Sequence, residues 1–146
     1  MKKLIIIFFL FLFSAVILCQ NGTYRCNVQR FTIDNDPSRD NEHNNSMIVT
    51  IDINDITGGY LLVSWPSENF TYKWGILGKI DTTVESETKT VYTQYDARFN
   101  LANVQGTKKV VVVLIQDLGK EHFHIAVTNP DLGTTNWYHN LTKVKY

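Results

Sequence analysis

The chain has 146 residues, and 14 Lys and Arg side chains balance 14 Asp and Glu side chains, so its formal net charge is zero at neutral pH. A length of this order fits one ordinary domain around a single hydrophobic core. The sequence contains no block of like charge, which argues against the strongly basic surfaces that bind nucleic acid or anionic membranes.

The amino terminus predicts export from the cell. Lys2 and Lys3 precede a nearly unbroken apolar run over residues 4–18, which is typical of a signal peptide, whereas a membrane-spanning helix needs roughly 20 apolar residues. We expect cleavage after Cys19, so that residues 1–19 are the signal peptide and residues 20–146 form one secreted, extracellular β domain. A lipid anchor on Cys19 is the alternative, because residues 16–19 loosely resemble a bacterial lipobox.

Cleavage at this point would leave 12 basic and 14 acidic side chains, a net charge of −2, and Cys26 as the only cysteine. We therefore predict a buried free thiol on the first strand. Cleavage one residue earlier would allow Cys19 to pair with Cys26. Four asparagines stand in Asn-x-Ser/Thr sequons and are glycosylation candidates in a eukaryotic secretory pathway, namely Asn21, Asn44, Asn69 and Asn140. An AT-rich bacterial genome would also explain the abundance of asparagine.

The predicted domain is all-β, because Val, Ile, Thr and aromatic residues are abundant after position 20 while alanine is scarce. The first strand includes Tyr24, and a change in its alternation predicts a bulge near Gln29 and Arg30. Polar residues 34–45 predict the one long loop. Residues 47–53 then alternate apolar and mostly polar side chains, the period of a strand that packs one face on a core.

Tight turns separate the next predicted strands. Residues 55–59 end in two glycines and predict a turn, a strand follows over residues 60–65, and residues 66–69 predict a second hairpin turn. The strand that starts at Phe70 should bend or bulge near its two glycines, Gly75 and Gly78. Residues 82–93 are polar on both faces, which predicts an exposed edge strand or a strand over a water-filled cavity.

The last third of the chain predicts three more strands. Residues 110–115 are six consecutive apolar side chains and indicate a central strand that is covered on both faces. Strands over residues 122–128 and 136–144 follow, with a turn between them. About eight strands joined mostly by tight turns predict one antiparallel domain, either an up-and-down barrel or a two-sheet sandwich.

The segment directly after the predicted signal peptide, Gly22, Thr23 and Tyr24, is similar to the Gly-x-Trp opening of lipocalin-like barrels. Together with the strand count, this resemblance implies a barrel, as an architectural analogy and not as membership of a family. Tyr24 stands where those proteins have tryptophan, and the chain lacks the length for the helix that follows their eighth strand.

Catalytic and cofactor motifs are absent from the sequence. It contains no Gly-x-Ser-x-Gly elbow, no P-loop, no Gly-x-Gly-x-x-Gly and no His-Glu-x-x-His. The only close pair of acids on one predicted strand face, Glu85 and Glu87, lies in a Thr-rich segment that is typical of a solvated surface. We therefore predict that the protein is not an enzyme and that it uses no cofactor.

Histidines suggest a metal site only weakly. His122 and His124 lie on one face of a predicted strand, about 7 Å apart at Cα. A third ligand would have to come from His43, His139 or a carboxylate, and the cupin pattern that begins with His-x-His expects a glutamate where this chain has Thr128. We predict no metal site here, and a solvent-facing pair of histidines instead.

Aromatic side chains gather around one predicted hairpin and indicate either a packed core or a ligand pocket. We take Trp65, Tyr72 and Trp74 as candidate ligand-binding residues, and further rings could join them in space, namely Phe70, Tyr92, Tyr95, Trp137 and Tyr138. The sequence thus predicts a secreted, non-enzymatic binding module for a small apolar molecule or a carbohydrate. The alternative is a structural or adhesive surface protein without a ligand cavity, whose loops contact a protein partner.

Overall fold

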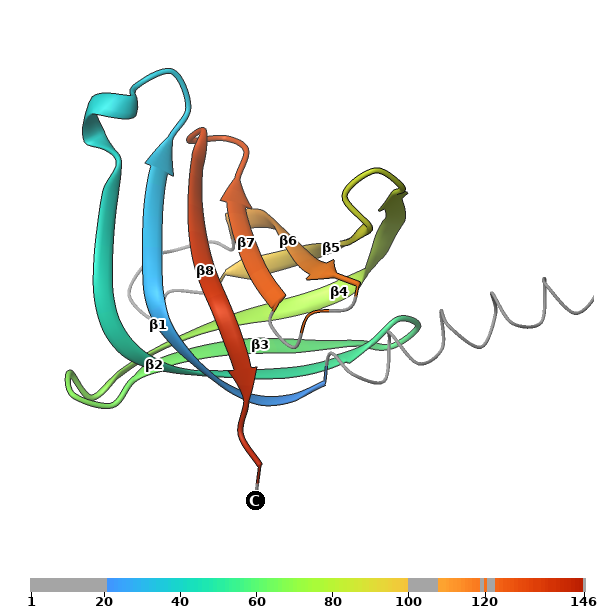
Figure 1. Ribbon diagram of the computed structural model, residues 1–146, viewed down its shortest axis with the longest axis horizontal. Coiled ribbons are helices and arrows are strands. Elements are labelled where there is room, and N and C mark those ends of the chain that lie inside the picture. The colour runs from blue at the N-terminus through green and yellow to red at the C-terminus, as the bar shows by residue number, and fades with distance from the viewer. Residues whose placement is uncertain (1–20, 100–107, 119, 121–122, 146) are drawn as a thin grey trace, which may run out of the picture.

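The computed structural model describes residues 21–99, 108–118, 120 and 123–145, which form one closed barrel of eight antiparallel strands (Figure 1). The strands follow chain order around the barrel, and β8 pairs with β1 to close it. Their bounds are β1 Gly22–Ile33, β2 Asn41–Asn54, β3 Gly58–Trp65, β4 Phe70–Glu85, β5 Thr90–Phe99, β6 Lys108–Asp117, β7 Phe123–Asn129 and β8 Thr134–Lys143. The all-β prediction is confirmed, and the barrel is the architecture that forms.

The predicted signal peptide and its cleavage after Cys19 lie outside the described residues, so export and the pairing of Cys19 stay predictions. Within the described residues, no helix is long and apolar enough to cross a membrane. Cys26 is free and buried on β1, as predicted, and its thiol donates to the backbone carbonyl oxygens of Val28 and His139, each at 3.3 Å. Burial raises the pKa of this thiol above its ordinary value.

Alternate side chains of the strands fill the barrel interior. On β2 the row predicted from the sequence, Met47, Val49, Ile51 and Ile53, is buried. This row packs with inward-pointing side chains from all seven remaining strands, including Leu61, Val63, Val112, Leu114, Ile125 and Leu141. One continuous apolar interior therefore carries the stabilisation, as the alternation predicts.

The prediction that residues 110–115 are covered on both faces is wrong. Val110, Val112 and Leu114 point into the barrel and are buried, while Val111, Val113 and Ile115 are only partly buried on its outer surface. A closed barrel has a single interior, and all eight described strands belong to it, so none is left to form a second layer.

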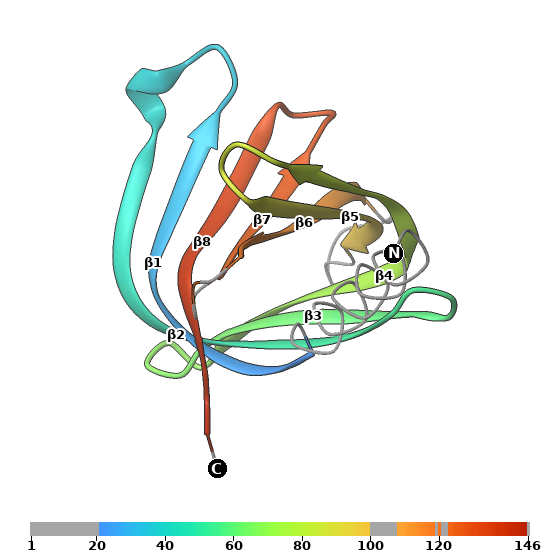
Figure 2. The same ribbon diagram turned by 45° about the vertical axis from the view of Figure 1, so that its right-hand side comes forward.

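Bulges bend the long strands so that the barrel can close. In β1 the register shifts between Cys26 and Val28, slightly before the predicted position at Gln29 and Arg30. In β4 it shifts between Ile76 and Gly78, as predicted, and again between Lys79 and Asp81. Bulged strands bend and twist more strongly, and both views show β1, β2 and β4 curving around the barrel (Figures 1 and 2).

Two further predictions are corrected by the strand pairing. The long loop expected over residues 34–45 is shorter, because β2 begins at Asn41 and a short 3-10 helix, η1 (Pro37–Arg39), lies within the connection. The edge strand expected over residues 82–93 is a hairpin, with its turn at residues 86–89 between β4 and β5. Lys89 adopts a positive φ of 56° in this turn, and because the turn contains no glycine or proline, the sequence does not predict it.

The two ends of the barrel differ. At one end the β2–β3 turn folds against β4 and β5, because the carboxylate of Asp55 accepts hydrogen bonds from the Tyr95 hydroxyl and the Lys79 ammonium, each at 3.1 Å. Beside it the Asn21 side chain pairs with the backbone of Ile53 through two hydrogen bonds, at 2.9 and 3.0 Å. The other end, where β1, β3, β5 and β7 finish, holds two cavities and is called the mouth below.

Candidate functional site

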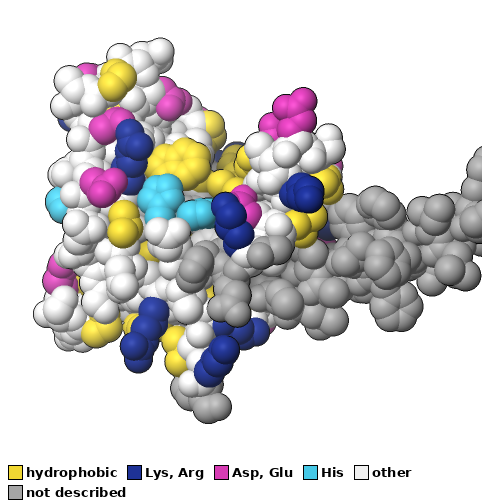
Figure 3. Space-filling model, viewed as in Figure 1, with side chains coloured by type: hydrophobic (Ala, Val, Ile, Leu, Met, Phe, Trp, Pro, Cys, Tyr) yellow, Lys and Arg dark blue, Asp and Glu magenta, His cyan; other side chains and the backbone are white. Residues whose placement is uncertain are grey.

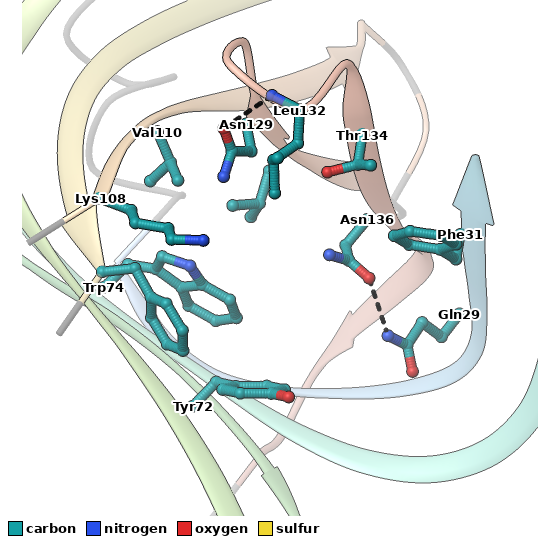
Figure 4. Close-up of a pocket in the computed structure, with 12 residues that line it drawn as sticks. Gln29, Phe31, Tyr72, Trp74, Lys108, Val110, Asn129, Leu132, Thr134 and Asn136 are labelled. Atoms are coloured by element: carbon teal, nitrogen blue, oxygen red, sulfur yellow. Dashed lines mark hydrogen bonds between the residues drawn. The ribbon is translucent and has the colours of Figure 1, made fainter. Parts of the chain in front are cut away.

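The mouth of the barrel holds a cavity of about 340 Å³, which we call the cup (Figure 4). Ligand pockets typically enclose about 300–1,000 Å³, so the cup has room for a small molecule only. Side chains from β1, β4, β5, β6, β7, β8 and the β7–β8 turn line it, and they are Gln29, Phe31, Tyr72, Trp74, Phe99, Lys108, Val110, Val127, Asn129, Leu132, Thr134 and Asn136.

One wall of the cup is aromatic. Tyr72 and Trp74 occupy alternate positions on β4, so both point inward, and Phe99 at the end of β5 pairs with Trp74 across the sheet. The ring centroids of Tyr72 and Phe99 are 5.3 Å apart, and those of Trp74 and Phe99 are 5.7 Å apart in a stacked arrangement. These contacts fix the three rings against one another, and Trp74 is almost wholly buried among them, with 4% of its surface exposed.

The opposite wall of the cup is polar and comes from β1, β7 and β8. The Gln29 side-chain amide donates to the Asn136 side-chain oxygen at 3.2 Å. The Asn129 oxygen accepts from the backbone N–H groups of Asp131 and Leu132, at 3.1 and 3.3 Å, which turns the Asn129 amide nitrogen into the cup (Figure 4). The wall therefore presents oriented amide donors and acceptors to the aromatic rings across the cavity.

A lysine supplies the charge in the cup. Lys108 starts β6, and its side chain lies among those that line the cavity (Figure 4). Among the described residues that line the cup, it is the only one with a formal charge. This single positive charge favours a ligand that carries an acidic group.

A second cavity of about 490 Å³, the side hollow, continues the cup toward β2 and β3. The two cavities share Gln29, Phe31, Tyr72 and Asn136. The side hollow adds more aromatic surface and polar side chains at the rim, namely Trp65, Phe70, Asn41, His43, Asn45 and Glu68. Because the cavities are contiguous, an elongated ligand could occupy both.

The floor below the aromatic wall contains a buried phenol without a partner. Tyr138 is 0% exposed and its ring lies 6.4 Å from that of Trp74. Within the described part of the chain, its hydroxyl has no hydrogen-bond partner. Burial raises the pKa of this phenol well above its ordinary value, so it stays protonated at neutral pH.

The structure brings together all three candidate ligand-binding residues. Tyr72 and Trp74 line the cup, while Trp65 and Tyr72 line the side hollow, with 5.4 Å between the centroids of Trp65 and Tyr72. The other aromatic candidates divide, since Phe70 and Tyr138 join this group whereas Tyr95 closes the far end of the barrel. Trp137 lies on the outer surface, where its indole N–H donates a hydrogen bond to the Thr32 hydroxyl at 3.1 Å. The Tyr92 hydroxyl donates a hydrogen bond to the Glu85 carboxylate at 3.3 Å.

Sequence reasoning missed the polar wall and the lysine. Gln29 and Asn136 belong to β1 and β8, and only barrel closure makes these strands neighbours. Phe31 enters the cup because the β1 bulge shifts inward-pointing side chains from even to odd positions. The change of alternation in the sequence was the available signal for that residue.

The remaining candidates from the sequence lie on the surface. The four sequon asparagines, Asn21, Asn44, Asn69 and Asn140, are all exposed. His122 lies outside the described residues, and His124 lies next to His139 on the outer surface. Glu87 belongs to the β4–β5 turn and so does not share a strand face with Glu85, which corrects the predicted pair.

Comparison of the chain with models of known protein families, with curated proteins and with solved structures finds no match. The function is therefore inferred from the geometry of the mouth.

Proposed function

We propose that the protein is a secreted, non-enzymatic binding module that holds a small molecule in the cup. The observation that carries this proposal is the arrangement of the mouth, where an aromatic wall faces a wall of side-chain amides across about 340 Å³. Concave sites of this kind, apolar with a few oriented polar groups, are the usual form of small-ligand sites. Sugars at the exposed sequon asparagines would be compatible with a secretory route.

A carbohydrate fits the cup better than a wholly apolar molecule. The C–H face of a sugar ring can stack on Tyr72 or Trp74, while its hydroxyl groups can bond to Asn129 and Asn136 on the opposite wall. A hydrocarbon would cover the same amides without replacing the hydrogen bonds they make to water, at a cost of about 1–3 kcal/mol for each group left unpaired. Lys108 adds a preference for a sugar with an acidic substituent.

Tryptophan fluorescence offers a direct test, because the chain has three tryptophans and two of them lie at the mouth. In a Trp137→Phe variant all indole emission would come from Trp65 and Trp74. We expect an acidic or neutral mono- or disaccharide, titrated from a panel, to change this emission, and native mass spectrometry to show one ligand per chain. Replacing Tyr72 by alanine in the same background should weaken binding at least about tenfold, or about 1.4 kcal/mol.

Two results would contradict the proposal. If neither the sugars nor a parallel panel of straight-chain fatty acids binds, the cup is not a ligand site. If a sugar binds equally well after the Tyr72→Ala substitution, the ligand lies elsewhere on the protein. Binding of fatty acids alone would reject the carbohydrate and retain the apolar ligand.

An adhesive or structural role is the second candidate, and exposed apolar side chains along β4 support it. Leu77, Ile80 and Val84 are exposed there, by 50%, 54% and 44%. Exposed apolar side chains on one strand are a common feature of protein-binding surfaces. Sedimentation of the purified chain would test this role. If the chain self-associates through β4, a Leu77→Asp, Ile80→Asp variant should be monomeric. A wild-type chain that stays monomeric would remove self-association as the adhesive mechanism.

A further inference from the structure

Two histidines lie side by side on the outer wall of the barrel, away from the cup. His124 is on β7 and His139 is on β8, and the register between these strands shifts between Phe123 and Ile125. Asn140 takes a positive φ of 55° at this irregularity. A bulge re-aims side chains, and here both imidazoles point outward and meet (Figure 3, cyan, over β8).

The two rings converge through the same type of nitrogen. The Nδ1 atoms of His124 and His139 are 3.3 Å apart, and the ring centroids are 5.4 Å apart. The backbone N–H of Asn140 also donates to His124 Nδ1 at 3.3 Å. His124 Nδ1 therefore carries a lone pair and its proton is on Nε2, so that His139 Nδ1 donates the hydrogen bond between the rings.

This spacing matches a pair of ligands on one metal ion. An ion about 2.05 Å from both nitrogens, the usual zinc–imidazole distance, would subtend an N–metal–N angle of about 107°, close to tetrahedral. We propose that His124 and His139 form a two-imidazole site for a borderline divalent ion such as Zn²⁺ or Cu²⁺. The ion takes the place of the shared proton and displaces the Asn140 N–H from the single lone pair of His124 Nδ1. Neutral His139 moves its proton from Nδ1 to Nε2, so the total charge on the ligands does not change.

The surroundings hold the pair in place and leave it accessible. The Trp137 and His139 rings are parallel, with an interplanar angle of 1° and 6.1 Å between their centroids. The indole N–H of Trp137 donates a hydrogen bond to the Thr32 hydroxyl, which fixes the indole in place. Both histidines are half-buried, so solvent reaches them. Among the described residues, no third His, Cys, Asp or Glu forms a group of three with them, and a site built from two imidazoles should bind with moderate affinity.

Calorimetric titration of the full chain with ZnCl₂ tests the site. We expect one ion per chain, and a loss of affinity of at least about tenfold in either His124→Ala or His139→Ala, since each removes one of two ligands. The Cu²⁺ form should show an electron paramagnetic resonance spectrum with coupling to two imidazole nitrogens, reduced to one in each variant. His139→Ala leaves the bond between Asn140 and His124 intact, so it reports on the site even if His124→Ala fails to fold.

The matched control is His43→Ala, which removes another exposed histidine from β2 and should bind Zn²⁺ with unchanged affinity. Undiminished binding in His139→Ala would overturn the proposal, because the ion would then rest on other histidines. So would the absence of a Zn²⁺ heat signal in the wild-type chain, or a Cu²⁺ spectrum with one nitrogen before any substitution.

Discussion

Two tyrosines buried in the barrel offer a test of how polar groups contribute to its stability, because their environments differ mainly at the hydroxyl. Tyr95 is 2% exposed, and its hydroxyl donates to the carboxylate of Asp55 at 3.1 Å. Tyr138 is 0% exposed, and within the described residues its hydroxyl has no partner. Replacing each by phenylalanine removes the same atom from the two environments.

The expected changes in the free energy of unfolding have opposite signs. A hydrogen bond to a charged acceptor contributes about 1.5–3 kcal/mol, and Asp55 keeps its ion pair with Lys79 in the variant, so Tyr95→Phe should destabilise by about 1.5 kcal/mol. An unpaired buried hydroxyl costs about 1–3 kcal/mol, so Tyr138→Phe should stabilise by about 1 kcal/mol once the small void is included. The two variants should therefore differ by about 2.5 kcal/mol.

Urea unfolding followed by far-ultraviolet circular dichroism measures this difference. The midpoint should fall for Tyr95→Phe and rise for Tyr138→Phe, with the same slope in all three proteins, because neither change alters the surface exposed on unfolding. A loss of stability in Tyr138→Phe comparable to that in Tyr95→Phe would refute the reasoning. It would show that a buried water, which forms about three hydrogen bonds in such sites, satisfies the phenol.

Three further predictions follow from the same interior. Val112→Asp should unfold the domain, at a cost above about 4 kcal/mol, because it places an unpaired charge in the barrel, whereas Glu87→Ala in an exposed turn should change thermal stability by less than about 0.5 kcal/mol. Gly58→Ala should lower the free energy of unfolding by at least about 2 kcal/mol, since φ is 78° and a Cβ would collide with a backbone carbonyl oxygen. Burial, reinforced by the nearby Asp55 carboxylate, raises the pKa of Tyr95. The protonated Tyr95 therefore contributes its full stabilisation below the pKa of a phenol in the unfolded chain, about 10, and this contribution declines as the pH rises further. Unfolding curves compared on either side of that pH should show this decline, and the Tyr95→Phe variant should show less of it.

Much of the secondary structure could be predicted from the sequence because side chains on a strand alternate between two faces. The row from Met47 to Ile53 was evident from that period alone, and the hairpin that carries Trp65 and Tyr72 was evident from the period together with the turn residues 66–69. The β4–β5 turn was not, because no glycine or proline marks it and Lys89 adopts its positive φ under the constraint of the paired strands.

The candidate sites depended on which strands become neighbours, and local periodicity contains no information about that. Pairing of β8 with β1 brings Gln29 to Asn136 and completes the cup. The sequence by itself determined an all-β domain with an apolar row on most of its strands and aromatic side chains around one hairpin. Only the tertiary structure decided that the strands close into one barrel, that Val111 and Val113 lie outside it, and that His124 meets His139, because strand order and register are set by contacts between residues far apart in the chain.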